Sequence, residues 1–158
     1  FLRVCKSCKT FIKVSMNKIN ISTDQEERVV YKDCTLYIEP TVESICFDSC
    51  ILENVNIISS NTDWISFISC VLNNVEIISR EVHISTSTVL NSSFKGSGDF
   101  SRVQIWHSNI LDSNFNFDSI EFQYSFICDG NLEVNNITLE QSNYKCSSIL
   151  ANQIVTIS

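Results

Sequence analysis

A short pattern of apolar and polar positions recurs along most of the chain. It consists of an apolar, a variable and a second apolar residue, then two variable positions and a Ser or Cys. The phrase "CFDSCILENVNIIS" at 46–59 returns in nearly the same form at 66–79 as "SFISCVLNNVEIIS". Alternation with a period of two is typical of a strand that buries one face. The pattern begins at Val29, Ile45, Ile65, Val82, Val103, Ile120, Ile137 and Val155.

A second short apolar stretch follows the first in most units, as at 52–57 and 72–77. A polar corner separates the two stretches, at Asn54, Asn74, Asn91 and Ser113, and Asn readily adopts the left-handed backbone conformation that a tight corner needs. A strand, a corner, a second strand and a return, repeated with a period of about 16–21 residues, predict an all-β parallel β-helix. Roughly 7–8 coils stacked about 4.8 Å apart would form a rod about 35–40 Å long.

The repeat also predicts which side chains share the interior of the rod. We expect residues 29–158 to form the β-helix and residues 1–28 to form an irregular N-terminal coil or cap. The first interior column is predicted to contain Val29, Ile45, Ile65, Val82, Val103, Ile120 and Ile137. Its neighbour is predicted to contain Tyr31, Phe47, Phe67, Ile84, Ile105, Phe122 and Leu139. A corner with room for small side chains alone is predicted at Cys34, Cys50, Cys70, Ser87, Ser108, Ser125 and Ser142.

Two runs, "STVLNSSFKGS" at 87–97 and "SNILDSNFNF" at 108–117, resemble turns of right-handed parallel β-helices. Such turns occur in the pectin-lyase-like superfamily and in related surface adhesins. The resemblance is architectural, covers the chain from about Val29, and implies the fold without a functional motif. The competing interpretation is a leucine-rich repeat, because Leu52, Val55, Ile57 and Asn61 fit that consensus. The later units are shorter than leucine-rich repeats, which need roughly 20–29 residues each, and this favours the β-helix.

Charge and composition restrict the partners. The net charge of −7 and the pI of about 4.7 argue against nucleic acid, whose binding proteins gather Lys and Arg on one face. No apolar run reaches the roughly 18 residues of a membrane-spanning helix, so we expect no membrane insertion. Three sequons, at Asn20, Asn91 and Asn136, are candidate N-glycosylation sites and favour a secreted or cell-surface location. Because Val155 starts a further strand, we expect the solenoid to continue beyond Ser158 or to pair there with another subunit.

The cysteines are candidates for disulfides. Cys5 and Cys8 have the spacing of a redox pair or half a zinc site, but no second such pair exists, which favours a structural disulfide. Cys50 and Cys70 occupy one predicted column on adjacent coils, where either a disulfide or two buried thiols fits. Cys128 and Cys146 would likewise lie on neighbouring coils. We expect no metal site and no cofactor.

The candidate binding surface lies on the outward positions of the main strands. Trp106 beside Gln104, His107, Glu121 and Tyr124 predicts a surface for carbohydrate or for a protein partner. The triplet at 61–63 resembles one signature of polygalacturonases, but the paired aspartates and the basic phrase of those enzymes have no counterpart, so we expect no catalytic site. The leading hypothesis is a non-enzymatic structural or adhesive rod segment of a larger extracellular glycoprotein, or a filament subunit. The alternative is a polysaccharide-binding or polysaccharide-active β-helix.

Overall fold

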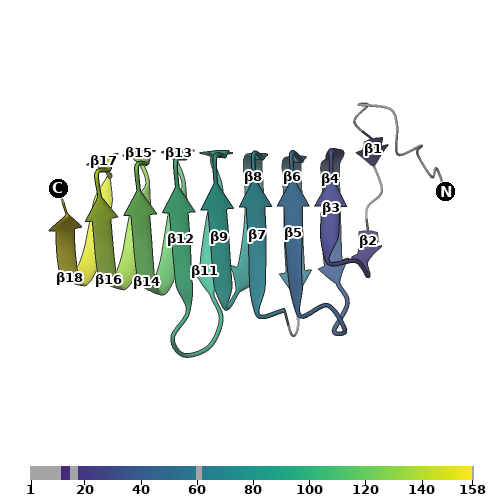
Figure 1. Ribbon diagram of the computed structural model, residues 1–158, viewed down its shortest axis with the longest axis horizontal. Coiled ribbons are helices and arrows are strands. Elements are labelled where there is room, and N and C mark those ends of the chain that lie inside the picture. Colours follow the sequence, from purple (N-terminus) through teal and green to yellow (C-terminus); the bar gives the residue numbers. More distant parts are fainter. Residues whose placement is uncertain (1–11, 15–17, 60–61, 158) are drawn as a thin grey trace.

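The structure, a computed structural model, describes residues 12–14, 18–59 and 62–157, with the backbone alone at 12–14. These residues form eighteen strands and no helix, in a β-solenoid of about eight turns (Figure 1). The strands are β1 (Ile12–Val14), β2 (Lys18–Ile21), β3 (Gln25–Glu27), β4 (Val29–Ile38), β5 (Ser44–Asp48), β6 (Ile51–Ser59), β7 (Trp64–Ile68), β8 (Val71–Ser79), β9 (Glu81–Ser85), β10 (Thr88–Leu90), β11 (Ser93–Gly96), β12 (Arg102–Trp106), β13 (Asn109–Leu111), β14 (Asn114–Gln123), β15 (Phe126–Cys128), β16 (Asn131–Glu140), β17 (Asn143–Lys145) and β18 (Ser148–Ile157).

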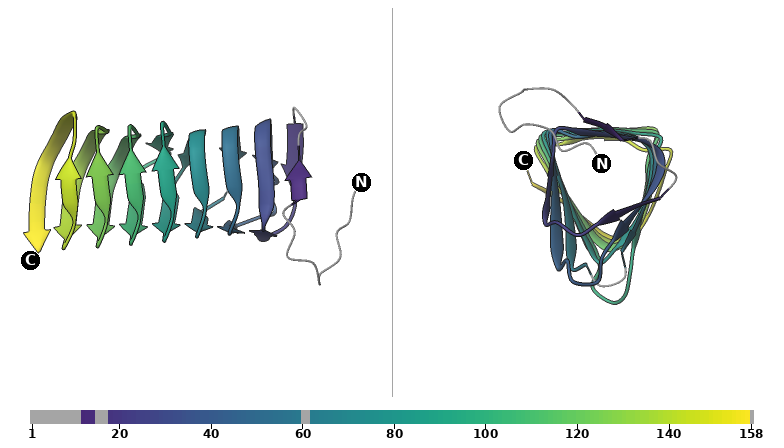
Figure 2. Two further views of the ribbon diagram at one scale, coloured as in Figure 1. Left: turned by 90° about the horizontal axis from the view of Figure 1, so that it is seen from above. Right: turned by 90° about the vertical axis from the view of Figure 1, so that its right-hand side faces the viewer.

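Viewed along its axis, the rod is a triangle with three sheet faces (Figure 2). Face 1 contains β3, β5, β7, β9, β12 and the second halves of β14, β16 and β18. Face 2 contains β1, the first halves of β4, β6 and β8, and then β10, β13, β15 and β17. Face 3 contains β2, the second halves of β4, β6 and β8, then β11 and the first halves of β14, β16 and β18. Every strand pairs in parallel with its equivalents in adjacent coils, which confirms the predicted all-β solenoid.

The interior is built from columns of identical or similar side chains. Ile45, Ile65 and Val82 pair in register, and Phe47, Phe67 and Ile84 form the next column. Phe47 and Phe67 are both fully buried, and their rings stack with centroids 5.2 Å apart and planes 9° apart. A single coil leaves these apolar side chains open to solvent on both sides, so neighbouring coils must stack to bury them.

Two of the three corners are turned by one residue with positive φ. Corner 1 joins faces 1 and 2, and its residues from Ser49 to Gln141 have φ between 43° and 55°. Corner 2 joins faces 2 and 3, where every such residue is Asn or Asp, including Asn54, Asn74 and Asn91. Asn and Asp tolerate this conformation best among residues with a side chain. Asp112 rather than Ser113 takes this position in its coil.

From Ser49 onward, the residue after each corner-1 turn is small, and it is buried in every coil but the last, where Ser142 is half-buried. These residues form what we call the corner 1 ladder. In each coil, the backbone N–H of the ladder residue donates to the Oγ or Sγ of its equivalent in the next coil, over 3.0–3.4 Å. A larger side chain would fill the space through which this bond passes. The ladder consists of Cys50, Cys70, Ser87, Ser108, Ser125 and Ser142.

The structure corrects the predicted register at both ends. Tyr31 pairs with Leu52, and Phe47 pairs with Glu26, so the unit 29–34 lies on face 2 and turns corner 2. In the last coil Ile137 pairs with Ile154 rather than with Val155, which keeps this coil as long as the one before it. Strands β2 and β3 already pair with β4 and β5, so part of the segment 1–28 belongs to the stacked coils.

Candidate functional site

The outward positions of face 1 form three rows of side chains that run along the rod. The alternation of each strand points every second residue outward, and the parallel register aligns these residues from coil to coil. One row contains Trp64, Glu81 and Arg102, the next contains His83, Gln104 and Glu121, and the third contains Trp106 and Gln123.

Aromatic rings cross these rows on consecutive coils. His83 lies between the two tryptophans, with ring centroids 5.1 Å from Trp64 and 6.4 Å from Trp106, both edge-on. At the adjoining corner 1, the rings of His107 and Tyr124 stack 5.0 Å apart with planes 4° apart. We call these five residues the aromatic patch. The chain has two Trp and two His in all, and the patch contains every one of them.

The carboxylate of Glu81 is fixed beside the patch by two cationic or hydrogen-bonding groups. His83 Nε2 and Arg102 Nη2 each lie 2.6 Å from Glu81 Oε1. Partial burial pushes the pKa of Glu81 up, but the contacts with Arg102 and His83 outweigh it and hold that pKa below its ordinary value. Glu81 is therefore an ionised group whose position is set by its neighbours.

Glu121 is fixed in a similar way, but by neutral groups. Gln104 Nε2 donates to Glu121 Oε2 over 2.9 Å, and Gln123 Nε2 donates to Oε1 over 2.8 Å. Each carboxylate oxygen has a second lone pair that can accept a further hydrogen bond. Face 1 thus presents hydrogen-bond acceptors at defined places next to half-exposed rings.

The structure brings together the five surface residues that the sequence indicated. Gln104, Trp106 and Glu121 lie on face 1, and His107 and Tyr124 lie at corner 1 beside them. The sequence predicts His83 on the outward row with Trp106, but it did not assign His83 to this surface, and it missed Trp64 altogether. The place of both residues in the patch depends on the register between coils. The repeat contains that signal, because both residues fall on outward positions of consecutive units. The role of this surface stays a prediction.

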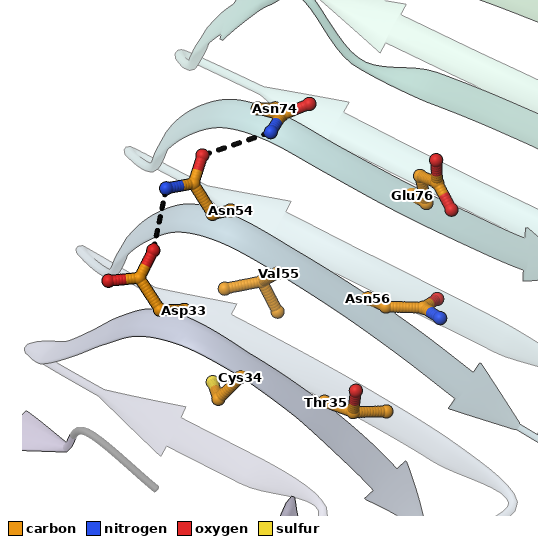
Figure 3. A pocket seen from close by; sticks show the side chains of 8 residues that line it. All are labelled: Asp33, Cys34, Thr35, Asn54, Val55, Asn56, Asn74 and Glu76. Atoms are coloured by element: carbon orange, nitrogen blue, oxygen red, sulfur yellow. Dashed lines mark hydrogen bonds between the residues drawn. The ribbon is translucent and has the colours of Figure 1, made fainter. Parts of the chain in front are cut away.

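A concave feature lies on corner 2 (Figure 3). It is a hollow of about 390 Å³, lined largely by polar side chains of three coils. Asn54 Nδ2 donates to Asp33 Oδ1 over 2.6 Å, and Asn74 Nδ2 donates to Asn54 Oδ1 over 2.9 Å. These amides satisfy one another along the rod, so the hollow has a structural explanation in the Asn-rich corner.

The six described cysteines are free thiols, while Cys5 and Cys8 lie outside the described residues. Cys70 Sγ donates to the backbone oxygen of Phe47 over 3.2 Å, as a member of the corner 1 ladder. The neighbouring Cys50 thiol and burial raise the pKa of Cys70. The candidate disulfide between Cys50 and Cys70 is thus replaced by two buried thiols bonded to backbone carbonyls.

The second candidate pair on neighbouring coils is also unbridged. Cys128 pairs with Lys145, so it is one position out of register with Cys146. Its Sγ instead donates to Asp129 Oδ2 over 3.0 Å. This contact raises the pKa of the Cys128 thiol.

The triplet at 61–63 is described at two of its three positions. Thr62 is buried and its Oγ1 donates to the backbone oxygen of Val42 over 3.2 Å, while Asp63 is exposed and lies 3.7 Å from Arg80. Thr62 therefore has a structural role. Within the part of the chain that the structure describes, no group of three or more His, Cys, Asp or Glu is placed to hold a metal ion.

The three predicted glycosylation sites, Asn20, Asn91 and Asn136, are all exposed. Across residues 12–14, 18–59 and 62–157, no helix is long and apolar enough to cross a membrane.

No family model, no curated protein and no solved structure matches this chain.

Proposed function

We propose that this protein is a non-enzymatic structural or adhesive rod segment of a larger extracellular or cell-surface glycoprotein, and that it serves in an assembly or filament. The observation that carries the proposal is the regularity of the rod. Its strands pair in parallel from coil to coil, and the interior columns, such as Ile45, Ile65 and Val82, continue in register along it. A stack of coils that share one core suits a protein that spaces or joins other parts, because each coil is held by its neighbours.

The backbone of β18 shows how one coil is joined to the next. Gln141 N–H donates to Ile157 O over 3.1 Å, so that carbonyl points back toward the preceding coil. Alternate residues of a parallel strand point their backbone groups to opposite sides, so the N–H of Thr156 points away from β16. Backbone groups with this orientation bond to the following coil elsewhere in the rod, so this N–H provides a test of stacking in the 158-residue chain.

Analytical ultracentrifugation over a range of concentrations tests the proposal. We expect the wild-type chain to associate and Thr156→Pro to remain monomeric, because proline removes the edge N–H without removing a ladder bond. The matched variant Thr156→Val keeps that N–H and should associate like the wild type. A wild-type chain that is monomeric throughout, or a proline variant that associates equally, would contradict the proposed assembly.

The extracellular part of the proposal has its own test. Three exposed sequons, at Asn20, Asn91 and Asn136, are compatible with glycans on the folded rod. The intact mass of native material should fall after treatment with an N-glycosidase. An unchanged mass would argue against the glycoprotein assignment and leave the rod proposal to the assembly experiment.

A second function, polysaccharide binding, is favoured by the aromatic patch and the fixed carboxylates of Glu81 and Glu121 beside it. Aromatic rings supply large apolar area, and carboxylates and amides supply directional hydrogen bonds. An adhesive rod and a glycan-binding rod are compatible, because the patch occupies part of one of the three faces of the solenoid.

A further inference from the structure

We propose that the aromatic patch binds an uncharged polysaccharide chain, and that face 1 discriminates against anionic polysaccharides. This inference rests on the second function proposed above and names its ligand class. It does not depend on end-to-end assembly.

The two tryptophans supply the apolar part of the proposed binding surface. Trp64 is 45% exposed and Trp106 is 38% exposed. Each lies on an outward position of its strand, β7 or β12, in which the alternate residues are buried. His83 lies between them and keeps the rings in a continuous diagonal. A pyranose ring has a face of C–H groups that packs against an aromatic ring. Successive sugars of one chain can therefore contact successive rings of the patch.

The fixed carboxylates supply the polar part of the proposed binding surface. Both close contacts of Glu81 involve Oε1, which leaves Oε2 for a ligand. Glu121 is held from two sides by Gln104 and Gln123. Sugar hydroxyls are donors that suit such acceptors. Because the acceptors are held by the protein, binding does not have to order them.

The charge of face 1 selects among polysaccharides. Its outward rows carry the carboxylates of Asp48, Glu81, Glu121 and Glu140, whereas Arg102 already pairs with Glu81. A uronate or sulfate chain laid along this face would meet net negative charge, and like charges in contact disfavour a partner strongly. An uncharged chain avoids that repulsion and still uses the acceptors.

The size of the patch favours a glycan over a folded protein. Four coils about 4.8 Å apart, each with five strand residues rising about 3.3 Å, cover roughly 320 Å² of sheet. A specific protein interface usually buries about 800 Å² on each partner. A single chain of sugars lying across the rings needs no more area than the patch provides.

Tryptophan fluorescence of the full 158-residue chain provides the assay, because both tryptophans lie in the patch. The probes are uncharged hexasaccharides (β-1,4-glucan, β-1,4-xylan, β-1,4-mannan and β-1,3-glucan), polygalacturonate and a lysine-rich peptide. We expect saturable binding of at least one uncharged hexasaccharide and weaker or no binding of polygalacturonate. Trp106→Ala should weaken binding at least tenfold, as measured by calorimetry. The matched control Ile78→Ala, a 55% exposed residue on face 3, should change it less than twofold.

Three results would overturn the inference: no uncharged glycan binds, both Trp64→Ala and Trp106→Ala bind like the wild type, or polygalacturonate or the peptide binds most tightly. Circular dichroism of each variant checks that the fold is retained. The Thr156→Pro variant separates this inference from the assembly proposal, since it should lose association and keep glycan affinity. Assembly without glycan binding would refute the ligand assignment alone.

Discussion

Replacing Ser108 with alanine tests the contribution of the corner 1 ladder to stability. Ser87 N–H donates to Ser108 Oγ over 3.1 Å, and both residues are buried. Ser108 Oγ in turn donates to the backbone oxygen of Trp106 over 2.7 Å. That oxygen keeps a second donor, the N–H of Thr86 at 3.0 Å. The substitution therefore leaves one buried group, the N–H of Ser87, without a partner.

An unpaired buried N–H lowers the free energy of unfolding by about 1–3 kcal/mol. For a chain of this size, each kcal/mol shifts the melting temperature by about 2–4 °C, so we expect Ser108→Ala to melt about 2–12 °C below the wild type. Ser108→Cys should lose less, because Cys50 and Cys70 occupy the equivalent position in earlier coils. Urea and thermal unfolding measure both variants.

The control is Ser97→Ala, since Ser97 is exposed and lies outside the ladder. Its free energy of unfolding should remain within about 0.5 kcal/mol of the wild type, as for most surface substitutions. Equal stability of Ser108→Ala and Ser97→Ala would refute the ladder as a stabilising element.

Three further predictions test the interior, a corner and a surface ion pair. Phe67→Asp places a charge against Phe47 in the sealed core and should lower the free energy of unfolding by several kcal/mol; an unchanged melting temperature would show that the assigned register is wrong. Thr86→Asn relieves a β-branched residue at φ 49° and should raise stability by up to about 1 kcal/mol in thermal unfolding, whereas a clear loss would contradict the strain. Because the pKa of Glu81 is lowered in the folded state, with burial opposing it and Arg102 lowering it, its stabilisation is present above pH 4.5 and lost as pH falls through the lowered pKa. Glu81→Gln should therefore flatten the acid limb of the stability profile below pH 4.5, and a profile parallel to the wild type would count against the ion pair.

The period of the repeat made the solenoid and most of its core predictable from sequence. The register of the first unit was not predictable, because both corners use the same order of inward, outward, left-handed and small residues. Phe47-Asp48-Ser49-Cys50 has this order at corner 1, and Tyr31-Lys32-Asp33-Cys34 has it at corner 2. A strand pattern alone cannot tell which corner a unit turns. In the last coil, Ile137 pairs with Ile154, so this coil has the same length as the preceding coil. The apolar alternation alone predicts that the strand begins at Val155.

The candidate site was predictable in part for a related reason. Gln104, Trp106 and His107 are near one another in sequence, so their proximity needs no knowledge of the coil length. Trp64 and His83 meet across coils, and the varying length of the return between faces 3 and 1 hides that contact. The free state of Cys128 and Cys146 likewise depends on a single position of register. Glu121 and Tyr124 also lie on another coil from Trp106, but the sequence indicated them because the spacing between coils is regular there. The contacts that sequence analysis misses are those between coils of differing length.

Electron microscopy of the chain at concentrations where it associates tests the central claim most directly. We expect particles of constant width that lengthen along the rod axis, with a repeat of about 4.8 Å for stacked strands. Thr156→Pro should give single short rods under the same conditions. Particles that widen by side-to-side association, or long rods formed equally by Thr156→Pro, would contradict assembly through the edge of β18.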